Sequence, residues 1–139
     1  MDNSILLKIS KKHKSPIYIY DGEKIENQYN RLKKAFSGIN KLKINYACKA
    51  LSNISILNFI RKLGSGLDTV SIQEVELGIK SGFKPKNIIY TPNGVSIEEI
   101  EKVSKMGVQI NIDNLSILEQ FGTKFPNTPV CIRINPHIM

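Results

Sequence analysis

The feature that most constrains the fold of this chain is a strand-and-helix unit that recurs about every 20 residues. Segments with helical periodicity separate short runs rich in apolar and β-branched residues, which are typical of buried strands. These runs are KINYACK (43–49), GLDTVS (66–71), NIIYTPN (87–93), VQINIDN (108–114) and PVCIRINP (129–136). Regular alternation of this kind predicts parallel strands joined by right-handed helical crossovers.

Capping signals mark the helix starts between the runs. Ser71 with Glu74, and Ser96 with Glu99, fit the capping box. In this motif the hydroxyl accepts a hydrogen bond from the amide three residues later, and the glutamate side chain reaches back to the first residue's amide. Two of the expected helices therefore have well-defined N-termini.

Two more helices show comparable signals. The segment 53–63 presents a single apolar face and is followed by Gly64, which is expected to end it. Asp113 or Asn114 is expected to cap the helix that follows the fourth run.

The chain before residue 41 has a different pattern. We predict a short strand over 17–20 and a helix over 23–36, which has apolar residues at helical spacing. We therefore divide the chain into 1–40, an N-terminal strand and helix, and 41–139, which holds the repeated units.

Two α/β architectures have strands and helices that alternate in this way. A dinucleotide-binding doubly wound sheet would place G-x-G-x-x-G after its first strand, but Gly64-Ser65-Gly66 comes before a strand. The even unit length favours a (β/α)8 barrel, which takes about 250 residues when complete. We therefore predict an α/β fold in which 41–139 forms about the first five units of a (β/α)8 barrel, truncated.

Charge and hydropathy exclude several classes of function. The net charge is +8, and nearly all of the excess is lysine without interleaved aromatic residues, so we expect no nucleic-acid binding. No apolar stretch approaches the ~18 residues of a membrane helix, and the N-terminus lacks a signal-peptide pattern. We expect an unprocessed cytosolic protein that does not contact membranes.

Cys48 and Cys131 each lie inside an apolar run. Neither has a second cysteine or a histidine at metal-binding spacing, so we expect no disulfide and no metal site. We expect both to be buried free thiols.

In parallel α/β folds, functional residues gather where the strands end. The polar residues at these ends are Lys49, Asp68, Ser71, Thr91, Asn93, Asp113, Arg133 and Asn135. Helix capping accounts for Ser71 and Asp113, and a turn before Gly94 accounts for Asn93. Lys49 and Arg133 are harder to explain as structural residues.

Arg133 lies between Ile132 and Ile134 in a run expected to be buried. If the isoleucines meet the helices, alternation along the strand turns Arg133 toward the strand-lined interior. There it would hold an anion or a phenolate-type oxygen. The alternative is an ion pair with a buried carboxylate such as Asp68.

The same alternation places Lys49 with Asn45 and Ala47. A lysine that reaches inward past a small alanine is partly desolvated, which favours its nucleophilic form. Its amine would then form a Schiff base with a carbonyl substrate or with pyridoxal phosphate. The alternative is a solvated surface lysine.

Residues 46–50, YACKA, followed by Ser52-Asn53, resemble the Y-A-x-K-A motif of fold-type III pyridoxal-phosphate enzymes. Within that class the chain resembles the amino-acid decarboxylases with an alanine-racemase-like barrel, and most of all the diaminopimelate decarboxylase family. Further segments are similar to that family in order and spacing: PIYIYD (16–21), GSGLDTVSIQEVELGIKSGF (64–83), IIYTPNGVSIEEI (88–100), QINIDNLSILEQFG (109–122) and PVCIRINPHIM (129–139).

This resemblance implies that Lys49 is catalytic and carries pyridoxal 5'-phosphate, with Asp68 and Arg133 near the cofactor. The implied reaction is decarboxylation of meso-diaminopimelate to L-lysine, by a homodimer when the protein is full length. Alternatives are a decarboxylase for ornithine, arginine or carboxynorspermidine, or a non-catalytic truncated product.

The resemblance also implies parts of the enzyme beyond position 139. In the family these are three more barrel strands, a glycine-rich phosphate site, a C-terminal β-domain, the acid that pairs with the pyridine nitrogen, and a catalytic cysteine. We therefore expect an N-terminal portion with little or no activity alone. Neither Cys48 nor Cys131 takes the role of that cysteine.

Overall fold

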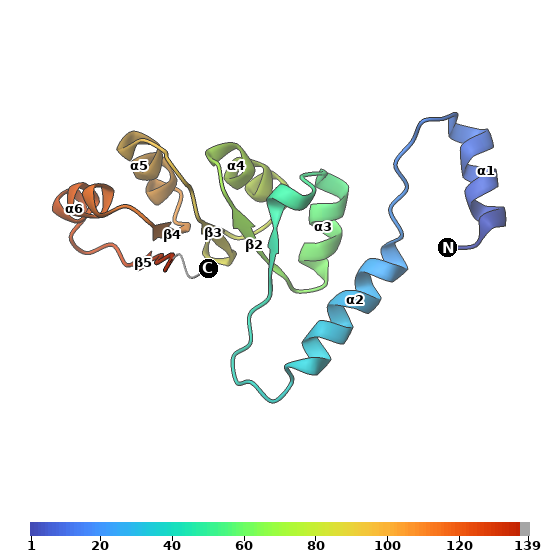
Figure 1. Ribbon diagram of the computed structural model, residues 1–139, viewed down its shortest axis with the longest axis horizontal. Helices are drawn as coiled ribbons and strands as arrows, with labels where there is room; N and C mark the ends of the chain where they lie inside the picture. Colours follow the sequence, from blue (N-terminus) through green and yellow to red (C-terminus); the bar gives the residue numbers. More distant parts are fainter. Residues whose placement is uncertain (137–139) are drawn as a thin grey trace. The chain divides into compact units, whose positions relative to one another are not determined.

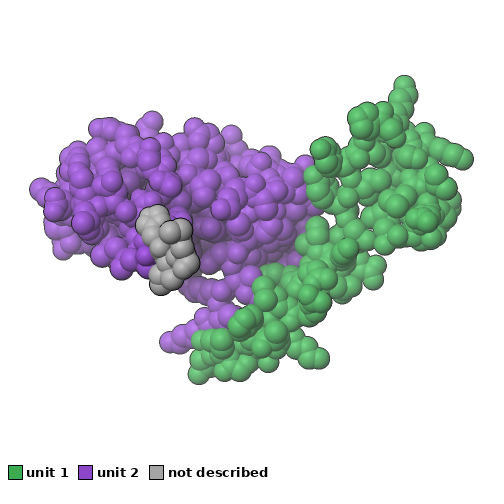
Figure 2. Space-filling model, viewed as in Figure 1, with its two compact units in different colours: residues 1–40 green, residues 41–139 purple. Residues whose placement is uncertain are grey.

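The computed structural model describes residues 1–136 and separates into two compact units (Figures 1 and 2). The first unit spans Met1–Asn40, and the second begins at Lys41. The described residues contain no helix that is both long enough and apolar enough to cross a membrane.

The first unit consists of two helices, α1 (Asn3–His13) and α2 (Gly22–Ala35). Helix α2 agrees with the helix predicted over 23–36, whereas α1 was not predicted. The strand predicted over 17–20 is wrong, because residues 14–21 join the helices without pairing to any strand. The side chain of Tyr18 is 91% exposed, so the alternating pattern there has no surface to pack on.

The second unit contains a parallel sheet of five strands. The strands are β1 (Asn45–Ala47), β2 (Gly66–Thr69), β3 (Ile88–Tyr90), β4 (Gln109–Ile112) and β5 (Val130–Ile132). The helices between them are α3 (Ile54–Lys62), α4 (Ile72–Lys80), α5 (Ile97–Lys105) and α6 (Leu115–Lys124), and two short 3-10 turns are η1 (Cys48–Ala50) and η2 (Pro85–Asn87). All five predicted strands are present, each shorter than its apolar run.

The order of the strands decides between the two architectures. Each strand pairs with the next one along the chain, so the spatial order is β1-β2-β3-β4-β5. A doubly wound sheet reverses its strand order at a switch point, whereas a barrel winds in one direction. The second unit is therefore a partial (β/α)8 barrel, with α3 to α6 along one side of the strands (Figure 1).

The core lies between the sheet and these helices. Alternate residues of the strands face the helices and are buried, including Leu67, Ile88, Tyr90, Ile110 and Ile112. Helix residues complete the core: Leu57, Ile60, Val75, Ile100, Val103 and Phe121. Full burial of a large apolar side chain contributes about 1.5–3 kcal/mol, so this layer is the main source of stability.

The capping boxes form in part. The hydroxyl of Ser71 accepts from the amide of Glu74 at 3.3 Å, and that of Ser96 accepts from the amide of Glu99 at 3.4 Å. The reciprocal half of the prediction is wrong in both cases. The Glu74 carboxylate accepts from the amide of Val70 at 2.8 Å instead of from Ser71, and the Glu99 side chain turns into the protein.

Glu99 instead joins three elements on the helix-facing side of the sheet. Its Oε1 accepts from the Tyr90 hydroxyl of β3 at 2.5 Å and from the Ile72 amide of α4 at 3.3 Å. Burial, together with the hydrogen bond to Glu99, raises the pKa of Tyr90 above its usual value. Tyr90 therefore remains a protonated donor.

The remaining helix ends largely follow the predictions. Asn114, not Asp113, caps α6, and its side chain accepts from the amide of Ile117 at 3.1 Å. Gly64 follows α3 with φ of 97°, a conformation that glycine adopts without strain.

The fifth strand is more exposed than predicted. Within residues 1–136, β5 pairs with β4 on one side only. Ile132 is 59% and Ile134 81% exposed, and Cys131 is exposed as well. The predictions that this run and its cysteine are buried are therefore wrong, because burial of a strand depends on neighbours outside its own sequence.

Candidate active site

The face of the sheet that points away from α3 to α6 is called the open face here. The core residues of each strand face the helices, so the residues between them lie on the open face. Strand register brings Ala47 of β1 opposite Asp68 of β2, and Asn111 of β4 opposite Cys131 of β5. Unlike the core, this face is polar near the C-terminal ends of the strands.

Lys49 lies at the C-terminal end of β1, in the turn η1. The turn contacts β2, and the amide of Leu51 closes it by donating to the carbonyl of Cys48 at 3.1 Å. Because β1 ends at Ala47 and Lys49 lies in η1, strand alternation does not determine the direction of its side chain. Lys49 is exposed at the edge where the parallel strands end.

Cys48 anchors the turn that carries Lys49. Its side chain is fully buried on the helix-facing side. Burial, with a smaller effect of the Glu74 charge, raises the pKa of the thiol to about 11. Cys48 is therefore a protonated packing residue and not a nucleophile.

A row of hydrogen bonds crosses the open face at the ends of β2, β3 and β4. Thr91 Oγ1 donates to Asp68 Oδ1 at 3.0 Å, and Asn111 Nδ2 donates to Thr91 Oγ1 at 3.0 Å. Asn111 Oδ1 is buried and has no hydrogen-bond partner among the described residues. The row holds Asp68 at one end and leaves a buried acceptor, Asn111 Oδ1, at the other.

The directions of these bonds support one another. The Thr91 hydroxyl has a single proton, and donating it to Asp68 leaves the oxygen free to accept from an amide NH2. The opposite orientation of the Asn111 amide would place its oxygen against Thr91 and compete with Asp68 for that proton. The row is therefore a consistent donor chain that runs from Asn111 to Asp68.

The sequence pattern alone assigns no role to Thr91 and does not single out Asn111 as a site residue. The signal for Asn111 was present, because Asn111 alternates with the apolar Ile110 and Ile112 and so belongs to the other face. What the sequence does not show is that the three side chains lie within hydrogen-bonding reach. That depends on the register between strands.

Arg133 directly follows β5, and its amide donates to the carbonyl of Ile112 at 2.8 Å. The side chain is exposed and lines a cavity of about 240 Å³ together with Asp113 and Ile134, among others. Within residues 1–136 Arg133 forms no ion pair, and β3 and β4 lie between it and Asp68. The alternative of an Arg133–Asp68 pair is therefore wrong.

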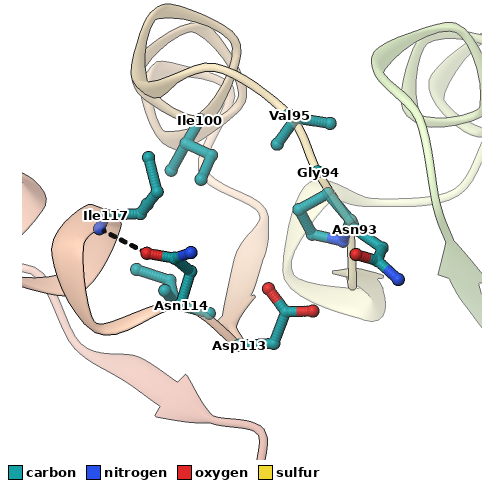
Figure 3. Close-up of a pocket in the computed structure, with 9 residues that line it drawn as sticks. Asn93, Gly94, Val95, Ile100, Asp113, Asn114 and Ile117 are labelled. Carbon is teal, nitrogen blue, oxygen red and sulfur yellow. Dashed lines mark hydrogen bonds between the residues drawn. The ribbon is translucent and has the colours of Figure 1, made fainter.

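A second cavity of about 200 Å³ opens at the same edge, between the loops that follow β3 and β4. Figure 3 shows the Asp113 carboxylate between Asn93 and Asn114, with Ile100 and Ile117 above Asn114 in this view. Since Asn114 caps α6, the carboxylate of Asp113 is not used as a helix cap. Polar groups of these two loops thus add to those of the strand ends.

Together, these elements place an amine after β1, a carboxylate on β2, a buried amide acceptor on β4 and a guanidinium after β5. All lie at the edge where barrel enzymes place their active sites. An amine forms an imine with an aldehyde, a guanidinium binds anions, and the two acceptors suit ligand N–H or O–H donors. The set suits an anionic ligand with a carbonyl group.

Comparisons with known proteins agree with this chemistry. Residues 22–139 match the family model described as pyridoxal-dependent decarboxylase, pyridoxal binding domain. The chain is 39% identical over 134 residues to diaminopimelate decarboxylase of Helicobacter pylori strain J99, covering 91% of this chain and 32% of that protein. It is 33% identical over 132 residues to diaminopimelate decarboxylase of Methanothermobacter thermautotrophicus, covering 94% of this chain and 31% of that protein.

A solved structure gives the same result. The crystal structure of Helicobacter pylori diaminopimelate decarboxylase complexed with L-lysine superposes with a TM-score of 0.84 at 37% identity. The match covers 96% of this chain and 35% of that one. The chain therefore spans about a third of the length of the relatives that it matches.

Proposed function

We propose, since this chain belongs to the pyridoxal-dependent decarboxylase family, that it is the cofactor-binding part of a diaminopimelate decarboxylase with Lys49 as its cofactor lysine. Membership of this family identifies the cofactor as pyridoxal 5'-phosphate. The observation that carries the proposal is the position of Lys49, on the turn after β1 and beside the strand that holds Asp68.

The residues at the strand ends fit this cofactor. The buried Asn111 Oδ1 has no hydrogen-bond partner within residues 1–136, and an acceptor in that state favours a ligand that donates an N–H or O–H group. Lys49 would supply an amine for the aldehyde of the cofactor, and the exposed Arg133 would supply a positive charge for an anionic group. We assign cofactor binding to Lys49, Asp68 and Arg133.

The cofactor, when bound, supplies an electron sink for the pair released as the α-carboxylate leaves as CO2. The protein residues act on position and charge. Lys49 would hold the cofactor through its amine, and Asp68, which Thr91 contacts through Oδ1, would offer its second carboxylate oxygen as an acceptor. Arg133 balances negative charge at the same edge.

We propose meso-diaminopimelate as the substrate and L-lysine as the product, because the relatives named above are diaminopimelate decarboxylases. The bound L-lysine of the Helicobacter pylori structure supports a basic amino acid as ligand. Under this proposal the working enzyme is a cytosolic homodimer, which sedimentation of the protein with pyridoxal phosphate would test.

Equilibrium dialysis against pyridoxal phosphate tests the assignment of Lys49. Wild type and Lys62→Ala, which removes an exposed lysine at the end of α3, should retain the cofactor equally. Lys49→Ala should retain at least about tenfold less, because a covalent attachment is lost. Equal retention by the two variants would contradict the assignment.

A further inference from the structure

The row of hydrogen bonds on the open face has a consequence for Asp68. A carboxylate on a strand end has several staggered side-chain positions, and holding it in one of them requires a partner. Asp68 has one described partner, the hydroxyl of Thr91 at 3.0 Å. Thr91 is itself oriented by Asn111 from the next strand at 3.0 Å.

The three side chains come from three adjacent strands of the sheet, β2, β4 and the end of β3. Parallel pairing joins β2 to β3 and β3 to β4. Residues held on paired strands keep their geometry better than residues on loops. The row therefore extends the rigidity of the sheet to the carboxylate.

We propose that Thr91 and Asn111 are positioning residues that hold Asp68 in the orientation in which it meets the cofactor. This inference rests on the proposed function. Thr91 donates its proton to Oδ1, so Oδ2 of Asp68 remains the acceptor for the ligand. Asn111 Nδ2 donates a hydrogen bond to Thr91 Oγ1. The hydroxyl proton of Thr91 therefore points toward Asp68 and not toward Asn111.

The chain offers a matched control for a lost hydroxyl. Thr69 lies on the helix-facing side of β2, is fully buried, and donates to the carbonyl of Ile89 at 2.9 Å. Thr69→Val and Thr91→Val remove the same group from opposite faces of one sheet. If losing a threonine hydroxyl only lowers stability, both variants should show the same effect. If Thr91 acts on the cofactor site, only Thr91→Val should weaken cofactor binding.

The test measures the pyridoxal phosphate concentration that half-saturates the full chain. Thr91→Val should raise it about tenfold, the usual effect of losing one hydrogen bond to a charged group. Thr91→Ser keeps the hydroxyl and Thr69→Val keeps the row, so both should stay within about twofold of wild type. Asn111→Leu should raise it at least as much as Thr91→Val, since it also removes a buried acceptor.

A second comparison asks whether Thr91 acts through Asp68. In an Asp68→Ala background, Thr91→Val should change the half-saturating concentration by less than about twofold, because the carboxylate that Thr91 positions is gone. A full tenfold effect in that background would overturn the inference, as would wild-type binding by Thr91→Val or Asn111→Leu. If binding by wild type does not depend on Lys49, the proposed function fails and the inference fails with it.

Discussion

The hydroxyl of Tyr90 donates to Oε1 of Glu99 at 2.5 Å, and this bond connects the buried side of β3 to helix α5. The same oxygen accepts from the amide of Ile72 at the start of α4. The Glu99 carboxylate thus joins α4 and α5 to β3 on the helix-facing side of the sheet.

Tyr90→Phe should lower the free energy of unfolding by about 1.5–3 kcal/mol, since it removes a buried hydrogen bond to a charged group. Tyr18→Phe is the matched control, because its side chain is 91% exposed; it should change stability by less than about 0.5 kcal/mol. Urea denaturation measures both. Equal stability of the two variants would show that the Tyr90–Glu99 bond contributes nothing.

Helix α4 approaches the sheet closely at Gly78. A Cβ at this position would lie 2.5 Å from Cδ2 of Leu67 and 3.3 Å from Cδ1 of Ile88, both of which are fully buried. Gly122 of α6 has nothing within 4 Å of the same atom.

The two helical glycines should therefore respond oppositely to alanine. Gly122→Ala should raise the free energy of unfolding by up to about 1 kcal/mol through helix propensity. Gly78→Ala should lower it by about 1 kcal/mol, because overpacking costs more than the propensity gain. The midpoints of urea denaturation give the comparison, and a Gly78→Ala protein as stable as Gly122→Ala would refute the close packing of α4.

Cys48 should make stability fall at alkaline pH. Its pKa is raised from 9.0 to about 11 in the folded chain, so above pH 9.0 the unfolded chain loses this proton first. The contribution is complete below pH 9.0 and decreases until about pH 11. A steeper decline for wild type than for Cys48→Ala over that range would agree, and parallel curves would contradict the shift.

Arg133 should contribute to cofactor affinity by charge. Arg133→Ala should weaken pyridoxal phosphate binding about tenfold, since hydrogen bonds to charged groups are worth about 1.5–3 kcal/mol. Arg31→Ala, which removes an exposed arginine of α2, is the control for net charge. If both variants weaken binding equally and added salt abolishes the difference from wild type, Arg133 acts only through overall charge.

The repeated units could be predicted because their signals are local. The run 66–71 contains β2, and the helix expected over 53–63 appears as α3. The strand expected over 17–20 failed because an alternating pattern forms a strand only where a partner strand is available. The prediction that β5 is buried failed for the same reason, because burial requires a neighbouring segment to cover the strand.

The candidate site was predictable in part. Lys49, Asp68 and Arg133 lie at strand ends, as parallel α/β topology requires. The row from Asn111 to Asp68 was not predictable, because it depends on register between strands about 20 residues apart. Glu99 was mistaken for a reciprocal cap because local spacing cannot show that Tyr90 is within reach.

Peptide mapping after borohydride reduction tests the central claim most directly. Borohydride reduces an imine between pyridoxal phosphate and a lysine to a stable secondary amine. Mass spectrometry of the digest then identifies the lysine that carries the label. The account predicts that label concentrates on Lys49 at low cofactor concentration and disappears from that peptide in Lys49→Ala. Label distributed evenly over the exposed lysines, with no preference for Lys49, would contradict it.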